Sequence, residues 1–243
     1  MQNRYNSILK ILSQKQQVTV AELSDELQVS SVTIRKDLSQ LEEKGLLKRA
    51  HGYATMINSD DVKKRLSFNY EIKRQIALKA LESIKDGETI MIESGSCCAL
   101  LAEEVILNRR DITIITNSVF IATFIRNKGS ARVVLLGGEY QNESQVMVGP
   151  LIKICAANFY VDKFFMGTDG FNEQGAMSVD LMRAEAVQNM SESAKHSIIL
   201  TESKKFTQTG VVPLLPYNKI DIIYTEKADN LTAKIKQVKV ETI

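Results

Sequence analysis

Cysteine and histidine are scarce in this chain of 243 residues, which has three cysteines and two histidines. Cys97 and Cys98 are adjacent and Cys155 stands apart, so the odd count does not fit a framework of disulfide bonds. His51 and His196 are far apart in the sequence, and the cysteines lack the spacing of zinc ligands. The sequence therefore gives no reason to expect a disulfide-stabilised fold, a metal site or a cofactor.

Long apolar runs are also missing. Residues 1–30 contain no stretch that resembles a signal peptide, and no segment reaches the roughly 18 consecutive apolar residues of a membrane-spanning helix. The composition, with 44% hydrophobic and 25% charged residues, is that of a globular protein, and the length suits a small domain plus a medium one. We expect a cytoplasmic protein that does not bind a membrane.

The net charge is small, but its distribution is uneven. The formal net charge is +2. Residues 1–57 contain 8 Lys/Arg and 6 Asp/Glu, which leaves 23 of each kind in the rest of the chain, so the whole excess lies in the first quarter. No acidic residue occurs between Lys44 and Ile57. A local basic patch of this kind is typical of a surface that contacts nucleic acid.

The first 57 residues have the pattern of three short helices. Apolar residues recur at helical spacing in Arg4–Gln14. Thr19, followed by Glu22 three residues later, predicts a capping box at the start of a second helix. After a short turn, Ser30 or Ser31 would cap a third helix. Helices joined in this order predict a helix-turn-helix.

The third helix has one apolar face and one polar, cationic face. Ile34, Leu38 and Leu41 are spaced i, i+4, i+7 and form a stripe that we expect to be buried. The other positions suit the major groove, because cations pair with phosphates and Arg or Gln side chains hydrogen-bond base edges. The candidate DNA-contacting residues here are Ser31, Val32, Thr33, Arg35, Lys36, Ser39 and Gln40. On the helix alone, an ordinary solvated face fits equally well.

A basic hairpin after this helix favours DNA binding. Leu46–Ala54 predicts two short strands, with Gly52 in the turn between them. Lys48, Arg49 and His51 would then lie along the DNA backbone or in the minor groove. The preceding helices and this hairpin together predict a winged helix-turn-helix.

The segment from Val18 to Ala54 resembles the amino-terminal signature of the DeoR family of bacterial regulators. The resemblance is carried by TIRKDL at 33–38 and by the Leu-x-Arg-x-His-Gly pattern at 47–52. Tyr53 stands where the family usually has a second glycine.

The rest of the chain has a different sequence pattern. Residues 58–72 are polar and lack a clear period, so we interpret them as a linker between a DNA-binding domain (1–57) and a larger domain (73–243). In the larger domain strand-like runs alternate with helical patterns, which predicts a Rossmann-like α/β fold with a mostly parallel sheet. The expected strands are Thr89–Ile92, Ile112–Thr116, Arg132–Leu136, Lys163–Met166, Ser197–Thr201, Ile220–Tyr224 and Val238–Thr242.

Short polar or glycine-rich blocks follow five of these strands. They are ESGSCC (93–98), TNS (116–118), LGG (136–138), GTDG (167–170) and ESKKF (202–206). Because each block follows a strand, all of them are expected at the carboxyl ends of the strands, where open α/β sheets bind ligands. Gly95 allows close approach, and the helix-start amides after it attract an anion. Plain connecting loops are the alternative.

The blocks resemble those of DeoR-family sensor domains, which are similar in fold to ribose-5-phosphate isomerase and usually bind sugar phosphates. Lys205 matches the family's lysine in its block and is the candidate partner of the anion. The resemblance implies an effector site at Glu93, Ser94, Gly95, Ser96, Cys97, Cys98, Asn117, Ser118, Gly137, Gly138, Gly167, Asp169 and Lys205.

Four residues of these blocks differ from the family's usual residues. Glu93 and Glu202 stand where aspartates are common, and Cys97 and Cys98 stand where threonines are common. A cysteine at a helix start can have a lowered pKa, so a redox switch at Cys97 is an alternative to the simpler role of a small buried side chain.

These features predict a sequence-specific DNA-binding transcriptional regulator. The resemblance implies a repressor of a sugar-metabolism operon that is released by a phosphorylated sugar. The expected partners are double-stranded operator DNA, the effector, and other copies of the chain in a dimer or tetramer, because one recognition helix covers little DNA.

The alternative is a sugar-phosphate isomerase-like enzyme fused to a DNA-binding domain. Asp169 matches a position that looks catalytic in those isomerases, which also need a lysine shortly after the same strand. Between Lys163 and Lys195 the chain has no lysine, and Arg183, the one basic residue there, cannot give up its proton. We therefore predict binding without turnover, and no catalytic residue.

Overall fold

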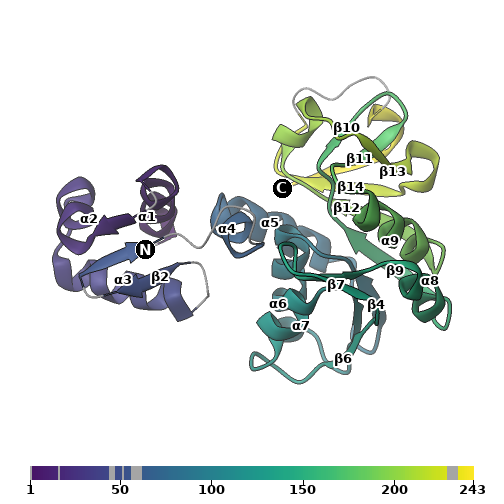
Figure 1. Ribbon diagram of the computed structural model, residues 1–243, viewed down its shortest axis with the longest axis horizontal. Helices are drawn as coiled ribbons and strands as arrows, with labels where there is room; N and C mark the ends of the chain where they lie inside the picture. Colours follow the sequence, from purple (N-terminus) through teal and green to yellow (C-terminus); the bar gives the residue numbers. More distant parts are fainter. Residues whose placement is uncertain (1, 16, 44–46, 51, 56–61, 229–234) are drawn as a thin grey trace. The chain divides into compact units, whose positions relative to one another are not determined.

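The computed structural model describes residues 2–15, 17–43, 47–50, 52–55, 62–228 and 235–243. The chain divides into two compact units, Met1–Glu71 and Ile72–Ile243. The division falls within helix α5 (Tyr70–Leu81), and each unit has its own secondary structure (Figure 1).

The first unit is built from short helices and short strands. Its elements are α1 (Gln2–Lys15), β1 (Gln17–Thr19), α2 (Val20–Leu27), α3 (Ser31–Glu43), β2 (Lys48–Ala50), β3 (Tyr53–Thr55) and α4 (Val62–Ser67). The predicted capping box of α2 is confirmed, since Thr19 Oγ1 accepts from the Glu22 amide at 3.2 Å and Glu22 Oε2 accepts from the Thr19 amide at 2.7 Å. At the start of α3, Ser30 Oγ accepts from the Thr33 amide at 3.2 Å, so Ser30 is the cap.

The core of this unit contains the apolar stripe predicted for α3. Ile34, Leu38 and Leu41 are buried. Asp37, on the same helix, is only 2% exposed and accepts hydrogen bonds from the guanidinium of Arg4, with the Nη2 to Oδ1 distance at 3.0 Å. A buried carboxylate needs such a partner, and this pair therefore ties α1 to α3.

The wing is a hairpin joined by a third strand. β2 and β3 are antiparallel, as predicted, and Gly52 between them has φ +84°, a conformation that favours glycine. β1 pairs with the other side of β3 and gives the strand order β1-β3-β2, which the sequence did not predict.

Part of the segment 58–72, which we interpret as a polar linker, is helical. Helix α4 lies inside this segment, and α5 begins at Tyr70, before the expected start of the larger domain at residue 73. The reason is an apolar pair that the polar composition concealed: Val62 and Leu66 stand one helical turn apart and both are buried.

The second unit is an α/β fold around a seven-stranded sheet. All neighbouring strands are parallel, in the order β15-β14-β12-β9-β4-β5-β6. The strands are β4 (Thr89–Ile92), β5 (Thr113–Thr116), β6 (Arg132–Leu135), β9 (Val161–Met166), β12 (Ala194–Leu200), β14 (Ile222–Thr225) and β15 (Lys239–Thr242). All seven predicted strands are confirmed, each with bounds within three residues of the expected ones.

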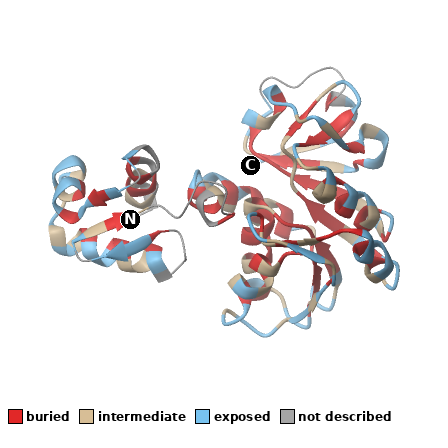
Figure 2. Ribbon diagram, in the orientation of Figure 1, coloured by how far each residue is buried: buried red, intermediate tan, exposed pale blue. Residues whose placement is uncertain are grey.

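Helices cover both faces of this sheet (Figure 1). They are α5, α6 (Ser96–Asn108), α7 (Val119–Ile125), α8 (Pro150–Ala156) and α9 (Leu181–Ser191), with 3₁₀ turns η1 (Ser203–Thr207), η2 (Tyr217–Lys219) and η3 (Ile235–Gln237). One core cluster joins α8 and α9 to sheet residues such as Met91, Phe164 and Ile199. Figure 2 shows the inner strands as buried. No described helix is long and apolar enough to cross a bilayer.

Two smaller β structures accompany the large sheet. β7 (Glu139–Gln141) and β8 (Val146–Val148) form a hairpin, and β10 (Gly170–Phe171), β11 (Gly175–Ser178) and β13 (Val212–Pro216) form a separate antiparallel sheet. The sequence analysis predicted neither of these structures.

Candidate functional site

The polar face of α3 is open to solvent, as a groove-reading helix requires. Val32 is 71% exposed, and Arg35 and Lys36 are exposed as well. Ser31 and Thr33 are half-buried, and the Thr33 hydroxyl lies 2.9 Å from Ser30 Oγ, which leaves mainly its methyl group for an outside contact.

The wing is held against this helix. Arg49 donates from its side chain to Ser39 Oγ and from its backbone amide to Glu42 Oε1 at 2.9 Å. These bonds place Arg49 beside the exposed face of α3, while Lys48 is exposed on the same strand. The predicted contact of His51 lies outside the described residues.

Gln40 has a different environment from the one expected. Its side-chain oxygen accepts a hydrogen bond from the hydroxyl of Tyr5 on α1, so the amide is turned toward the neighbouring helix. Gln40 is therefore a weaker candidate for reading a base than Arg35, because its acceptor is already engaged within the unit.

In the second unit the five sequence blocks meet at one edge of the sheet. They follow β12, β9, β4, β5 and β6, which are five adjacent parallel strands. The chain adds strands on one side from β4 to β6 and on the other side from β9 to β15, so the order reverses between β4 and β9. Ligands of open α/β sheets bind at such a reversal.

The helix that starts at this reversal has no side-chain cap from its N-cap residue, Gly95. Gly95 precedes α6 with φ +129°. The Ala99 amide donates to Gly95 O at 2.9 Å, so the amides of Ser96, Cys97 and Cys98 come before the first intrahelical donor. Such amides, together with the helix dipole, attract an anion.

The blocks after β4 and β9 lie close together. A Cβ atom placed on Gly167 would lie 3.8 Å from Ser94 O. Glu93 and Ser94 are both buried, and the Ser94 hydroxyl donates to Glu93 Oε1. The backbone of the GTDG block therefore lies close to the residues that lead from β4 into α6.

A buried lysine that the sequence reasoning missed lies at the same edge. Lys73 of α5 is 3% exposed, and its Nζ lies 3.6 Å from Glu202 Oε2. Lys204 Nζ lies 3.1 Å from the other oxygen of Glu202. Burial lowers the pKa of Lys73, while the charge of Glu202 acts to raise it.

The sequence did contain a signal for Lys73. Ile76, Ala77 and Ala80 are buried on one face of α5, and Lys73 lies three and four residues before the first two. A lysine on the apolar stripe of a helix is a candidate functional cation, because burial of a charge is costly without a partner.

Lys205 is half-buried, and its backbone amide donates to Glu202 O at 2.9 Å. Glu202 forms ion pairs with Lys73 and Lys204, so the structure adds these two cations to the one that the sequence indicated.

Asp169 is held by three donors. Its Oδ2 accepts from the Val179 amide at 3.0 Å, from Ser178 Oγ at 3.3 Å and from Arg183 Nη2 at 3.4 Å. Its carboxylate is therefore fixed by local structure at the carboxyl edge of β9.

In the TNS block, Ser118 caps a helix, whereas Asn117 has a side-chain oxygen that could bind a ligand. Ser118 caps α7, since its hydroxyl accepts from the Ile121 amide at 3.1 Å. The Asn117 amide nitrogen donates to Met147 O at 3.0 Å, while its Oδ1 is buried without a hydrogen-bond partner among the described residues. A buried free acceptor of this kind suits a ligand or a water molecule.

The cysteines are buried thiols. Cys97 and Cys98 are both buried, and burial raises the pKa of Cys97 to about 12 and that of Cys98 well above its usual value. The charges of Lys73 and Lys204 act to lower the pKa of Cys97 but do not outweigh burial. Burial therefore favours the simpler role of a small buried side chain for Cys97 over the redox alternative, because a protonated, buried thiol reacts poorly.

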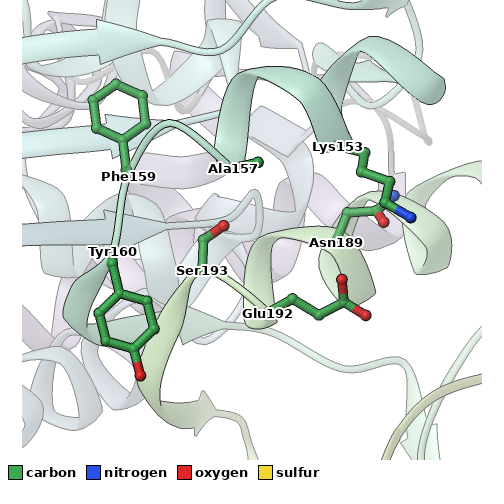
Figure 3. A pocket seen from close by; sticks show the side chains of 7 residues that line it. All are labelled: Lys153, Ala157, Phe159, Tyr160, Asn189, Glu192 and Ser193. Atoms are coloured by element: carbon green, nitrogen blue, oxygen red, sulfur yellow. The ribbon is translucent and has the colours of Figure 1, made fainter.

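A hollow of about 300 Å³ lies at the opposite edge of the sheet (Figure 3). Phe159, Tyr160 and Ser193, which line it, come just before the amino ends of β9 and β12. None of the predicted effector residues lines this hollow, so we favour the carboxyl edge, where the cations and the uncapped start of α6 lie. The described residues contain no cluster of three metal-ligating side chains.

A helix-turn-helix with a basic wing, together with an α/β unit of this kind, defines a DNA-binding transcriptional regulator. The model of the DeoR-like helix-turn-helix domain matches residues 4–60, and that of the DeoR C-terminal sensor domain matches residues 68–227. This chain belongs to the DeoR family of transcriptional regulators.

Two relatives illustrate the similarity. The HTH-type transcriptional regulator GolR of Listeria innocua is 30% identical over 232 residues, which cover 93% of this chain and 91% of GolR. The glycerol-3-phosphate regulon repressor of Escherichia coli is 27% identical over 227 residues, which cover 92% and 90% of the two chains.

A solved ribose 5-phosphate isomerase from Plasmodium falciparum aligns with a TM-score of 0.42 and 16% identity, covering 57% of this chain and 53% of that one.

The two glycines of the LGG block are predicted to differ in their tolerance of a side chain. A Cβ on Gly138 would lie 2.5 Å from Val148 O, whereas one on Gly137 would meet nothing closer than Cys155 Sγ at 3.8 Å. Gly138→Ala should lower the free energy of unfolding by about 1–3 kcal/mol, and Gly137→Ala should have little effect. Denaturant titrations of both variants and the parent measure this; equal stabilities would contradict the close approach of β8.

The three cysteines should differ in reactivity. Cys155 is half-buried, whereas Cys97 and Cys98 are buried and have raised pKa values. With iodoacetamide at about pH 8, Cys155 should be labelled in the native protein and the other two only after denaturation. Peptide mass spectrometry measures this, and native labelling of Cys97 as fast as that of Cys155 would restore the redox alternative.

Proposed function

We propose that this protein represses a sugar-metabolism operon in the cytoplasm and leaves its operator when a phosphorylated sugar binds at the carboxyl edge of the large sheet. The observation that carries the proposal is the buried pair of Lys73 and Glu202, joined by the exposed Lys204, at the same edge of the sheet as the uncapped start of α6. A cation in a desolvated site next to a helix start is suited to a phosphate.

Within this site the phosphate would bind to the amides of Ser96–Cys98 and to Lys73. The sugar would extend along the strand ends, where Asn117 Oδ1 can accept from a hydroxyl group. Lys73 lies two residues after the division between the units, so a ligand that binds it would act on the first helix of the sensor unit.

Binding without turnover is the second part of the proposal. Asp169 is engaged by Arg183, Ser178 and the Val179 amide, and no lysine lies between Lys163 and Lys195. Lys73 comes from another element and lies next to Glu202. These observations favour a sensor over the isomerase-like alternative.

The protein should bind its operator as a dimer or tetramer through α3 and the wing. Arg35→Ala should weaken operator binding by about 1–3 kcal/mol and relax the preference at one base pair. Lys36→Ala should weaken binding to all DNA sequences alike. It should also reduce the slope of the logarithm of the binding constant against the logarithm of the salt concentration by about one. Lys15→Ala, which removes an exposed cation of α1, is the control and should change neither. Binding selections with shuffled operators, repeated at several salt concentrations, distinguish the three variants; if all three behave like the parent, another surface binds DNA.

The effector site is tested by operator titrations with phosphorylated sugars, glycerol 3-phosphate and their unphosphorylated forms. A phosphorylated compound should lower operator affinity by about 5- to 150-fold, and its unphosphorylated form should not. Ser96→Asp should abolish this response, because a carboxylate would occupy or repel the phosphate position. Ser130→Asp introduces the same charge just before β6, at the other edge, and should respond like the parent. An unchanged response of Ser96→Asp would place the phosphate elsewhere.

A further inference from the structure

The sensor unit has an apolar surface on the outer side of α8. Leu151 and Ile154 lie three residues apart on this helix and are 53% and 63% exposed, and Tyr160, just after it, is 75% exposed. The opposite side of α8 already packs into the core through Ile152 and Ala156. The outward apolar side chains are thus not needed for folding, and a gathering of this kind marks an interaction surface.

The hollow of Figure 3 lies beside these side chains and has one charge of each sign at its rim. Lys153 of α8 and Glu192, just after α9, both line it and are exposed. Within the described part of the chain, neither charge has an ion-pair partner. α8 and α9 pack against each other, which fixes the two charges on one face.

We propose that this α8 surface (Leu151, Lys153, Ile154, Tyr160 and Glu192) is the interface at which a second copy of the chain binds. In a twofold dimer the same patch faces itself, so each residue meets the partner's version of the patch. Lys153 of one copy then faces Glu192 of the other, and the pair forms twice. The apolar side chains supply the centre, and the charges supply the rim.

This self-complementarity is the reason for choosing a second copy. A patch with one cation and one anion beside an apolar centre matches a copy of itself, whereas a uniformly charged patch would repel its copy. The inference rests on the proposed function in one respect, since a regulator with one recognition helix per chain needs two chains to read repeated half-sites.

A second group of exposed apolar residues provides the matched control. Val179 and Val211 are exposed, the latter by 83%, and the Val211 amide donates to Ser178 O. Ser178 also contacts Asp169, so this group borders the carboxyl edge of the sheet instead of the hollow. Its neighbouring charges, Asp169 and Arg183, already pair with each other at 3.4 Å, unlike Lys153 and Glu192 on the α8 surface.

The test is sedimentation equilibrium of the full chain over a range of concentrations. The parent should be dimeric or larger, and Ile154→Glu should raise the dissociation constant at least about tenfold. Val211→Glu should leave it unchanged. Both side chains are exposed in one copy, and circular dichroism checks that both variants fold.

Charge reversal then tests which residues face each other. The dimers of the Lys153→Glu variant and of the Glu192→Lys variant should each dissociate, because two pairs of like charges would replace the two ion pairs. When the two variants are mixed in equal amounts, a heterodimer should form with about the parent's affinity, which only residues facing each other across an interface can produce.

Three results would overturn the proposal: a monomeric parent, a dimer that survives Ile154→Glu, or charge-reversed variants that do not recover on mixing. Operator release by a phosphorylated sugar is measured on the same variants. If release persists while the α8 surface fails its test, the interface lies elsewhere and the proposed function stands; if the interface is confirmed and no sugar phosphate acts, the proposed effector is wrong.

Discussion

The first backbone amides of an α-helix have no hydrogen-bond acceptor within the helix. In the sensor unit, one such helix start lies at the centre of the large sheet. α6 begins directly after β4, beside the point where the strand order reverses between β4 and β9. With glycine at position 95, no side chain caps the amides of Ser96, Cys97 and Cys98. The parallel sheet brings the ends of the neighbouring strands β5, β6, β9 and β12, and the sequence blocks that follow them, to the same edge.

Lys73 adds a charge to this region from a different part of the chain. Its ammonium is buried next to Glu202, which also pairs with Lys204. A buried ion pair adds little to stability, but removing its partner leaves a costly charge. An anion that binds here would either compete with Glu202 for Lys73 or pair with Lys73 beside it. Because Lys73 belongs to α5, binding would then change the forces that hold this helix in place.

Much of this arrangement could be predicted from the sequence, and the missed parts have physical causes. The strands and the capping box at Thr19 follow from local patterns, and the strand ends follow from parallel topology. α4 was missed because two buried side chains, Val62 and Leu66, stand in a polar segment. The Lys73–Glu202 pair and the Gln40–Tyr5 contact join residues far apart in the chain, and no periodicity encodes such contacts. The role of Gly138 likewise depends on the approach of β8.

The central claim is that the start of α6 binds the phosphate of the effector. Hydrogen exchange of the backbone amides, with and without a sugar phosphate that releases the operator, tests it most directly. The account predicts slower exchange for the amides of Ser96, Cys97 and Cys98, and little change around Ala157 and Ser193 at the hollow. Unchanged exchange at Ser96–Cys98, with protection at the hollow, would contradict it.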